Sequence, residues 1–85
     1  ELVDMHGLSS AYLVMSGYYQ IQNQTDSALF YLQRAYNYSI QINDLFLISE
    51  SASHLSDLYE KINQLDTAIK YQRIYSLLLV LYQNS

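Results

Sequence analysis

Apolar side chains recur at steps of three and four residues along this chain, which is the spacing that places them on one face of an α-helix. Two series carry the pattern most clearly, and they consist of Leu8, Tyr12, Met15, Tyr19 and of Leu45, Ile48, Ala52, Leu55, Tyr59, Ile62. Short polar segments at 23–26, 43–44 and 63–66 interrupt the pattern, and the chain contains no proline. We therefore predict an all-α fold of four antiparallel helices, near 3–22, 26–42, 45–62 and 66–83.

A shift of 40 residues superimposes the first half of the chain on the second. The identical pairs include Ser16 and Ser56, Tyr19 and Tyr59, Asn23 and Asn63, Gln24 and Gln64, Asp26 and Asp66, Ala28 and Ala68, and Tyr31 and Tyr71. Such a repeat predicts two copies of one helix–turn–helix hairpin, at about 3–42 and about 45–83, within a single domain over 1–85. Because the chain begins at Glu1, we expect it to be a fragment of a longer repeat array.

Several of the recurring residues have structural explanations. These residues are Tyr19, Asn23, Ala28, Tyr59, Asn63 and Ala68. The two alanines lie in the first turns of a second helix, where a small side chain lets antiparallel helices approach closely. The two tyrosines close a first helix, where the ring fills the base of the hairpin. The two asparagines are expected to end a helix in left-handed backbone geometry, as glycine often does.

The spacing in the second half resembles a known repeat family. The segment Leu55-Ser56-x-x-Tyr59-x-x-x-Asn63-x-x-x-x-Ala68-x-x-x-Gln72-x-x-Tyr75 is similar to the tetratricopeptide repeat, and the first half matches it with Tyr12, Met15, Ser16, Tyr19, Asn23, Ala28, Leu32 and Ala35. Asparagine replaces the family's turn glycine, the aromatic and second alanine of the second copy are replaced, and the period is 40 rather than the usual ~34. The resemblance implies two stacked hairpins of an α-solenoid, with Ala35 as a further small packing residue.

The resemblance also implies a function. Tetratricopeptide repeats are non-catalytic modules that bind proteins or peptides. The segments 55–61 and 68–71 are similar to the lengthened repeats of sensory and regulatory proteins in Bacteroidetes-type bacteria. That narrower similarity implies the repeat region of a bacterial sensory or transcriptional regulator, located in the periplasm or the cytoplasm.

Charge and composition exclude several other functions. Eight acidic residues against four lysines and arginines give a formal net charge of −4, which argues against a nucleic-acid partner and against an anionic membrane surface. The longest apolar run, at 77–82, is far shorter than the ~20 residues of a membrane-spanning helix. The chain has no cysteine, and His6 and His54 lack the spacing of a metal-ligand set. We therefore expect no catalysis, no metal and no cofactor.

The family's partner groove is lined by the first helix of each repeat. The positions that the resemblance carries over are Ser10, Leu13, Gly17, Gln20, Ile21, Glu50, Ser53, Asp57, Glu60 and Lys61. They are acidic or neutral except for Lys61, so the basic clamp by which some members hold a terminal carboxylate is absent. A polar or basic protein or peptide would fit this surface better. A face that is merely solvated explains the same residues equally well.

The last predicted helix carries two apolar stripes. The stripe expected to face its own hairpin consists of Ala68, Gln72, Tyr75, Leu79 and Tyr82, and the second stripe consists of Ile74, Leu77, Leu78 and Leu81. At ~25 cal/mol per Å², leaving the second stripe in water would forfeit several kcal/mol, so we expect it to dock on a further repeat or on a second copy. In the first helix, Val14, Tyr18 and Ile21 are expected to pack on an upstream hairpin. An alternative function is therefore a structural spacer, or a self-association segment that dimerises through the last helix.

Overall fold

A computed structural model describes residues 4–84, and within that range it contains four α-helices and no strand. The helices are α1 (Met5–Ile21), α2 (Thr25–Gln41), α3 (Leu45–Lys61) and α4 (Leu65–Gln83). The all-α prediction is confirmed. The predicted helices agree with these bounds to within a residue or two, except that the predicted start at residue 3 lies outside the described residues.

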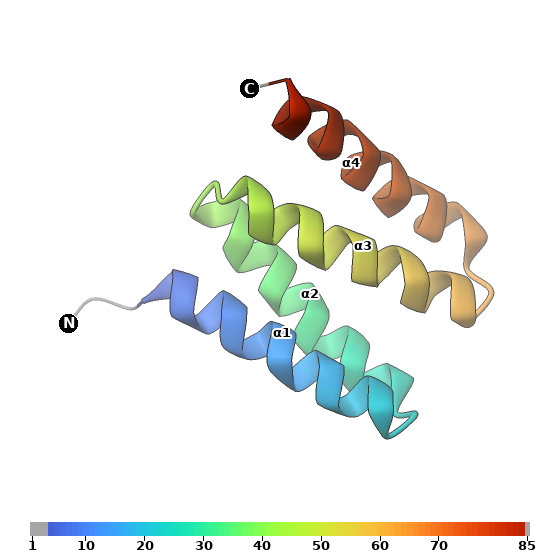
Figure 1. The fold of residues 1–85 in the computed structure, drawn as a ribbon. Coiled ribbons are helices and arrows are strands. Elements are labelled where there is room, and N and C mark those ends of the chain that lie inside the picture. Colours follow the sequence, from blue (N-terminus) through green and yellow to red (C-terminus); the bar gives the residue numbers. More distant parts are fainter. Residues whose placement is uncertain (1–3, 85) are drawn as a thin grey trace.

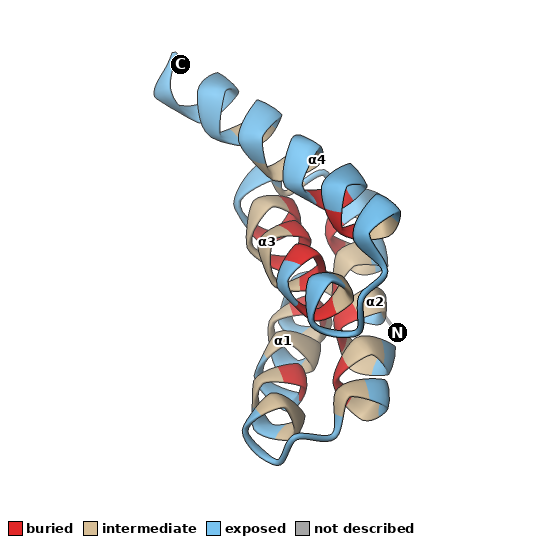
Figure 2. Cartoon of the chain, turned by 90° about the vertical axis from the view of Figure 1, so that its right-hand side faces the viewer, coloured by how far each residue is buried: buried red, intermediate tan, exposed pale blue. Residues whose placement is uncertain are grey.

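Successive helices run antiparallel and form two hairpins, α1–α2 and α3–α4 (Figure 1). Each helix packs on the next one in the chain, and α1 also contacts α3. Figure 2 shows the result as two layers, with α1 and α3 in one layer and α2 and α4 in the other. Within the described chain α4 packs mainly on α3, and its Tyr71 also contacts Tyr36 and Gln33 of α2, whereas the opposite side of α4 has no neighbour.

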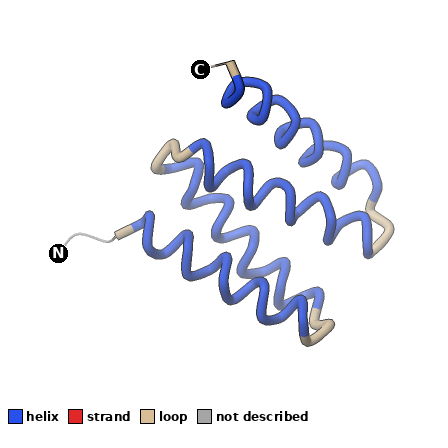
Figure 3. The backbone as a smooth tube through the Cα atoms, in the orientation of Figure 1, coloured by secondary structure: helices blue, strands red, loops and turns tan. Residues whose placement is uncertain are grey.

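The three turns share one backbone geometry, whether they join the helices of one hairpin or the two hairpins (Figure 3). In the first turn the Asn23 N–H donates to the Gln20 carbonyl at 3.0 Å, and the Gln24 N–H donates to the Tyr19 carbonyl at 2.9 Å. This pair of bonds satisfies carbonyls at the end of α1. The same bonds recur in the other two turns, and the left-handed residues are Asn23 (φ 58°), Asn43 (φ 55°) and Asn63 (φ 67°). The prediction for Asn23 and Asn63 is confirmed, and Asn43 adopts the same geometry.

The turn between the hairpins provides a direct test of this geometry. Replacing Asn43 by alanine should lower the free energy of unfolding by about 1 kcal/mol, because a left-handed conformation is costly for a residue with an ordinary Cβ. Replacing Asn43 by glycine should leave the free energy of unfolding at or above the wild-type value, because glycine has no such cost. Urea unfolding followed by circular dichroism measures both. Equal midpoints for the alanine and glycine variants would contradict the proposed role.

The core lies where α3 packs between its neighbours (Figure 2). Its buried residues are Ala28, Leu32, Ala52, Leu55, Leu58 and Tyr71. Among the residues expected to be structural, Ala28, Ala35 and Ala68 are buried. Tyr19 and Tyr59 are half-buried and pack against this core. The small side chains of the buried alanines let the helix backbones approach closely, as the sequence predicts.

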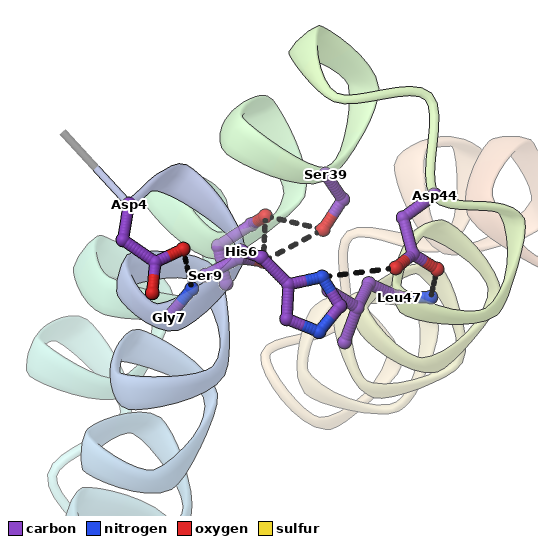
Figure 4. A network of polar contacts seen from close by, with 8 residues as sticks. Asp4, His6, Gly7, Ser9, Ser39, Asp44 and Leu47 are labelled. Carbon is purple, nitrogen blue, oxygen red and sulfur yellow. Dashed lines mark hydrogen bonds and ion pairs between the residues drawn. The ribbon is translucent and has the colours of Figure 1, made fainter. Parts of the chain in front are cut away.

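Buried serines support the close approach of α1 to α2. The Ser9 hydroxyl donates to the Ala35 carbonyl at 2.9 Å, and the Ser39 hydroxyl donates to the same carbonyl at 2.6 Å (Figure 4). The two serine oxygens lie 2.8 Å apart, and both residues are fully buried. Because each hydroxyl has a partner, these small polar residues can be buried without an unsatisfied hydrogen-bonding group.

The orientation of α4 agrees with the prediction only in part. Ala68 is buried and Tyr75 packs against the core, as expected. Gln72 is exposed, although its side-chain oxygen accepts a bond from the Ser56 hydroxyl of α3 at 3.4 Å, and the neighbouring Tyr71 is buried. Leu79 and Tyr82 are 40% and 51% exposed. The physical reason is that α4 has a neighbour on one side only, so the side of the helix that carries Gln72 is left uncovered in the described chain.

Candidate functional site

The predicted groove residues of the second hairpin lie together on one side of α3. We call this side the outer face of α3, and its residues are Phe46, Glu50, Ser53, Asp57, Glu60 and Lys61. Asp57 and Glu60 are exposed, whereas Glu50 and Ser53 are half-buried. The spacing by three and four residues places the three carboxylates along one line on the helix.

Two contacts modify the charge of this face. The Glu50 carboxylate lies 3.7 Å from Nε2 of His54, one helical turn further on, and both side chains are 44% exposed. Lys61 is the one cation on the face, and its Nζ donates to the Asn23 side-chain oxygen at 3.3 Å. This bond directs the lysine towards the first hairpin. This end of the face therefore carries two carboxylates, those of Asp57 and Glu60, against one ammonium group.

The first hairpin contributes less than the resemblance implies. Leu13 is partly buried and packs against the core, so its side chain serves the fold. The Gln20 amide donates to the Ser16 hydroxyl at 3.1 Å within α1. Ser10 and Gly17 are half-buried, and Ile21 is exposed. Most of the accessible polar groups of the predicted groove therefore lie on α3.

A cleft of about 500 Å³ opens between α3 and α4 beside the outer face of α3. The residues that line this α3–α4 cleft are Phe46, Ser49, Glu50, Ser53, Tyr75, Leu79 and Tyr82. The structure therefore brings two predicted groove residues of α3 together with residues of α4 that were expected only to pack. Sequence analysis missed Phe46, although it precedes Glu50 by one helical turn and that spacing places it on the same face.

A second cleft, of about 550 Å³, lies beside the first at the start of α3, and the two clefts share Phe46 and Tyr82. Its lining includes His6, Asp44 and Leu81. Nδ1 of His6 lies 3.2 Å from one carboxylate oxygen of Asp44, and the other oxygen accepts the Leu47 N–H at 3.0 Å (Figure 4). Both oxygens of this carboxylate already serve the fold, one as the N-cap of α3 and one in the contact with α1. This cleft is consequently a weaker candidate for ligand binding.

The second apolar stripe of α4 is divided by the fold. Ile74 packs against the core and Leu78 is half-buried, which corrects the expectation of one separate stripe. Leu77 and Leu81 are 61% and 50% exposed. The reason is that α4 docks on α3 through a face rotated towards Tyr71, which takes Ile74 and Leu78 with it. Only Leu77 and Leu81 of the four remain on the surface.

Between residues 4 and 84, no group of three histidine, aspartate or glutamate side chains is placed to hold a metal ion. Burial raises the pKa of Tyr36 and Tyr59 above the usual tyrosine range, and charge repulsion from Tyr71 adds to the rise. These hydroxyls therefore remain protonated at neutral pH. No helix in the described part of the chain is long and apolar enough to cross a bilayer.

Comparison of the chain with protein-family models, with curated proteins and with solved structures found no match.

Proposed function

We propose that this chain is a non-catalytic interaction module that binds an extended protein segment along the outer face of α3. The observation that carries the proposal is the α3–α4 cleft, which lies beside a line of carboxylates. The partner segment would place an apolar side chain in the cleft and basic side chains opposite Glu50, Asp57 and Glu60.

The cleft supplies the apolar part of this recognition. Phe46, Tyr75 and Leu79 give it a wall of aromatic and aliphatic surface. Large apolar anchors in a partly desolvated pocket contribute most of the affinity in many interfaces. Ser49 and Ser53 add hydroxyl groups that can hydrogen-bond a partner backbone.

The carboxylates supply the selectivity. A basic partner is attracted to Glu50, Asp57 and Glu60, and an acidic partner is repelled by them. The chain as a whole has a formal net charge of −4, which adds to the attraction at longer range. Because these groups are exposed or half-buried, salt should weaken the attraction.

Two labelled peptides test the proposal. The first is fluorescein-Gly-Ser-Lys-Leu-Lys-Phe-Ser-Gly, and the second carries glutamate in place of both lysines. Fluorescence anisotropy should detect binding of the basic peptide and no binding of the acidic one. The substitution Glu50→Gln should weaken the basic peptide by about fivefold, the effect of losing one partly exposed charge pair. Asp26→Asn, on α2, removes the same charge away from the cleft and should weaken binding much less, through the net charge alone.

Two results would overturn the proposal. One is equal affinity for the two peptides, since the carboxylates would then select nothing. The other is an equal loss for Asp26→Asn and Glu50→Gln, since net charge alone would then explain the binding. A place in a bacterial sensory or transcriptional regulator, which follows only from the resemblance, stays a prediction.

A further inference from the structure

The contact between the two hairpins is built from a few buried residues. Ala28 and Leu32 of α2 lie in one core cluster with Leu55 and Leu58 of α3, and all four are 3% exposed or less. The α2–α3 contact thus shows how the second helix of one hairpin packs against the first helix of the next hairpin, and we call the side of α2 in this contact the receiving surface.

A repeat copy of this receiving surface lies open on α4. An end cleft of about 410 Å³ is lined by Ser56, Glu60, Leu65, Ala68, Ile69 and Gln72. Forty residues earlier, Ala28 and Leu32 are buried under α3, at the positions that correspond to Ala68 and Gln72. In the described chain no helix covers the end cleft, and Ile69 on its wall is 49% exposed.

The surface of α3 that packs on α2, called here the inserted surface, has an exposed counterpart on α1. Leu55 and Leu58 of α3 correspond, 40 residues earlier, to Met15 and Tyr18. Both are exposed, Tyr18 to 58%. Val14 and Ile21 extend the same exposed surface, and Ile21 is 81% exposed. No lysine, arginine, aspartate or glutamate occurs within α1, so this surface carries no fixed charge that would oppose burial.

From these two open surfaces we propose that copies of this chain associate head to tail, with α1 of one copy packing on α4 of the next as α3 packs on α2. Met15 and Tyr18 of the incoming copy occupy the end cleft beside Ile69. The proposed occupant is a second copy because the inserted and the receiving surface belong to the same chain and correspond to the two sides of an interface already formed in it. The contact joins two different surfaces, so it leaves one of each free and continues into linear oligomers.

The exposed leucines of α4 do not take part in this contact. Leu77 and Leu81 correspond to Asn37 and Gln41 of α2, which stay exposed beside the packed α3. Packing that repeats the α2–α3 geometry would leave both leucines in solvent. A dimer through Leu77 and Leu81 is therefore a different assembly, with different residues, and it does not grow beyond two copies.

Sedimentation velocity on the 85-residue chain, from about 1 μM to about 1 mM, tests the proposal over the affinity range of weak to moderate self-association. Wild type should show a series of oligomers that grows with concentration. Ile69→Glu places a carboxylate in the α4 surface, and Tyr18→Glu places one in the α1 surface. Each variant alone should therefore remain monomeric, with an apparent Kd raised at least ~10-fold. Both substitutions are at exposed positions, and circular dichroism should show wild-type helicity.

Mixing the two single variants gives the decisive result. The intact α1 surface of Ile69→Glu can bind the intact α4 surface of Tyr18→Glu, so the mixture should form one-to-one dimers and nothing larger. The double variant Leu77→Glu with Leu81→Glu is the control and should keep the wild-type series. A monomeric wild type at the highest concentration, a mixture that stays monomeric, or a loss of assembly in the Leu77/Leu81 variant would each overturn the proposal. The proposal does not rest on peptide binding.

Discussion

Replacing Leu55 by alanine should lower the free energy of unfolding by about 2–5 kcal/mol, the range found when a fully buried leucine is truncated in a core. Leu55 is 0% exposed and lies in the core cluster that includes Leu32 of α2 and Tyr71 of α4. Its loss therefore leaves a cavity where three helices meet. Domains of this kind have a total stability of about 5–15 kcal/mol, so the variant should lose a large share of it.

The matched control is Leu77→Ala, the same chemical change at a side chain that is 61% exposed. It should alter the free energy of unfolding by less than about 0.5 kcal/mol, as surface substitutions usually do. Urea unfolding followed by circular dichroism measures both variants under one two-state analysis. Similar losses for Leu55→Ala and Leu77→Ala would show that the core lies elsewhere.

Replacing Ala28 by leucine should lower the free energy of unfolding by about 1–3 kcal/mol, because the larger side chain has no space in the packed core. Ala28 is 0% exposed and belongs to the cluster that joins α2 to α3. The corresponding change Ala68→Leu should cost less, below ~1 kcal/mol, because Ala68 borders the open end cleft into which new methyl groups can extend.

Thermal unfolding separates these cases, since each kcal/mol lowers the melting temperature of a domain of this size by roughly 4–8 °C. Ala11→Leu is the control at an exposed position of α1 and should melt near wild type. Equal costs for Ala28→Leu and Ala68→Leu would contradict the difference in packing between the two hairpins. A wild-type melting temperature for Ala28→Leu would contradict the close packing itself.

The helices and turns were largely predictable because their signals are local. The steps of three and four residues fix each helix, and the asparagines at 23 and 63 mark two of the helix ends. The third turn was located at Asn43-Asp44, and the left-handed geometry of Asn43 could have been inferred from the same residue type in the other two turns. Local backbone preference decides these features, so a single sequence carries them.

The face of α4 was not predictable in the same way. The segment 77–82 is apolar on every side, so periodicity does not select one direction. In α2, Leu32 is buried by α3, whereas its counterpart Gln72 is exposed because no helix covers that side of α4. The neighbours of a helix, rather than its own pattern, decide which of several apolar stripes is buried.

The candidate site was also predictable only in part. The resemblance to the tetratricopeptide repeat placed Glu50, Ser53, Asp57 and Glu60 on one face of a helix, and in the structure they share the outer face of α3. The α3–α4 cleft depends on Tyr75 and Leu79 of a different helix, and the engagement of Lys61 by Asn23 joins residues 38 positions apart. Contacts of this kind follow from packing and have no signature within one segment.

The sequence by itself determined the helices, their ends, the repeat of 40 residues and the alanines that allow close packing, because each depends on neighbouring residues or on a direct comparison of the two halves. Only the tertiary structure decided which side of α4 is buried, which polar residues are engaged and where the clefts open. Those features depend on how far each helix is covered by others. How much of a helix is covered depends on the whole folded chain, in which the two copies of the hairpin have different neighbours.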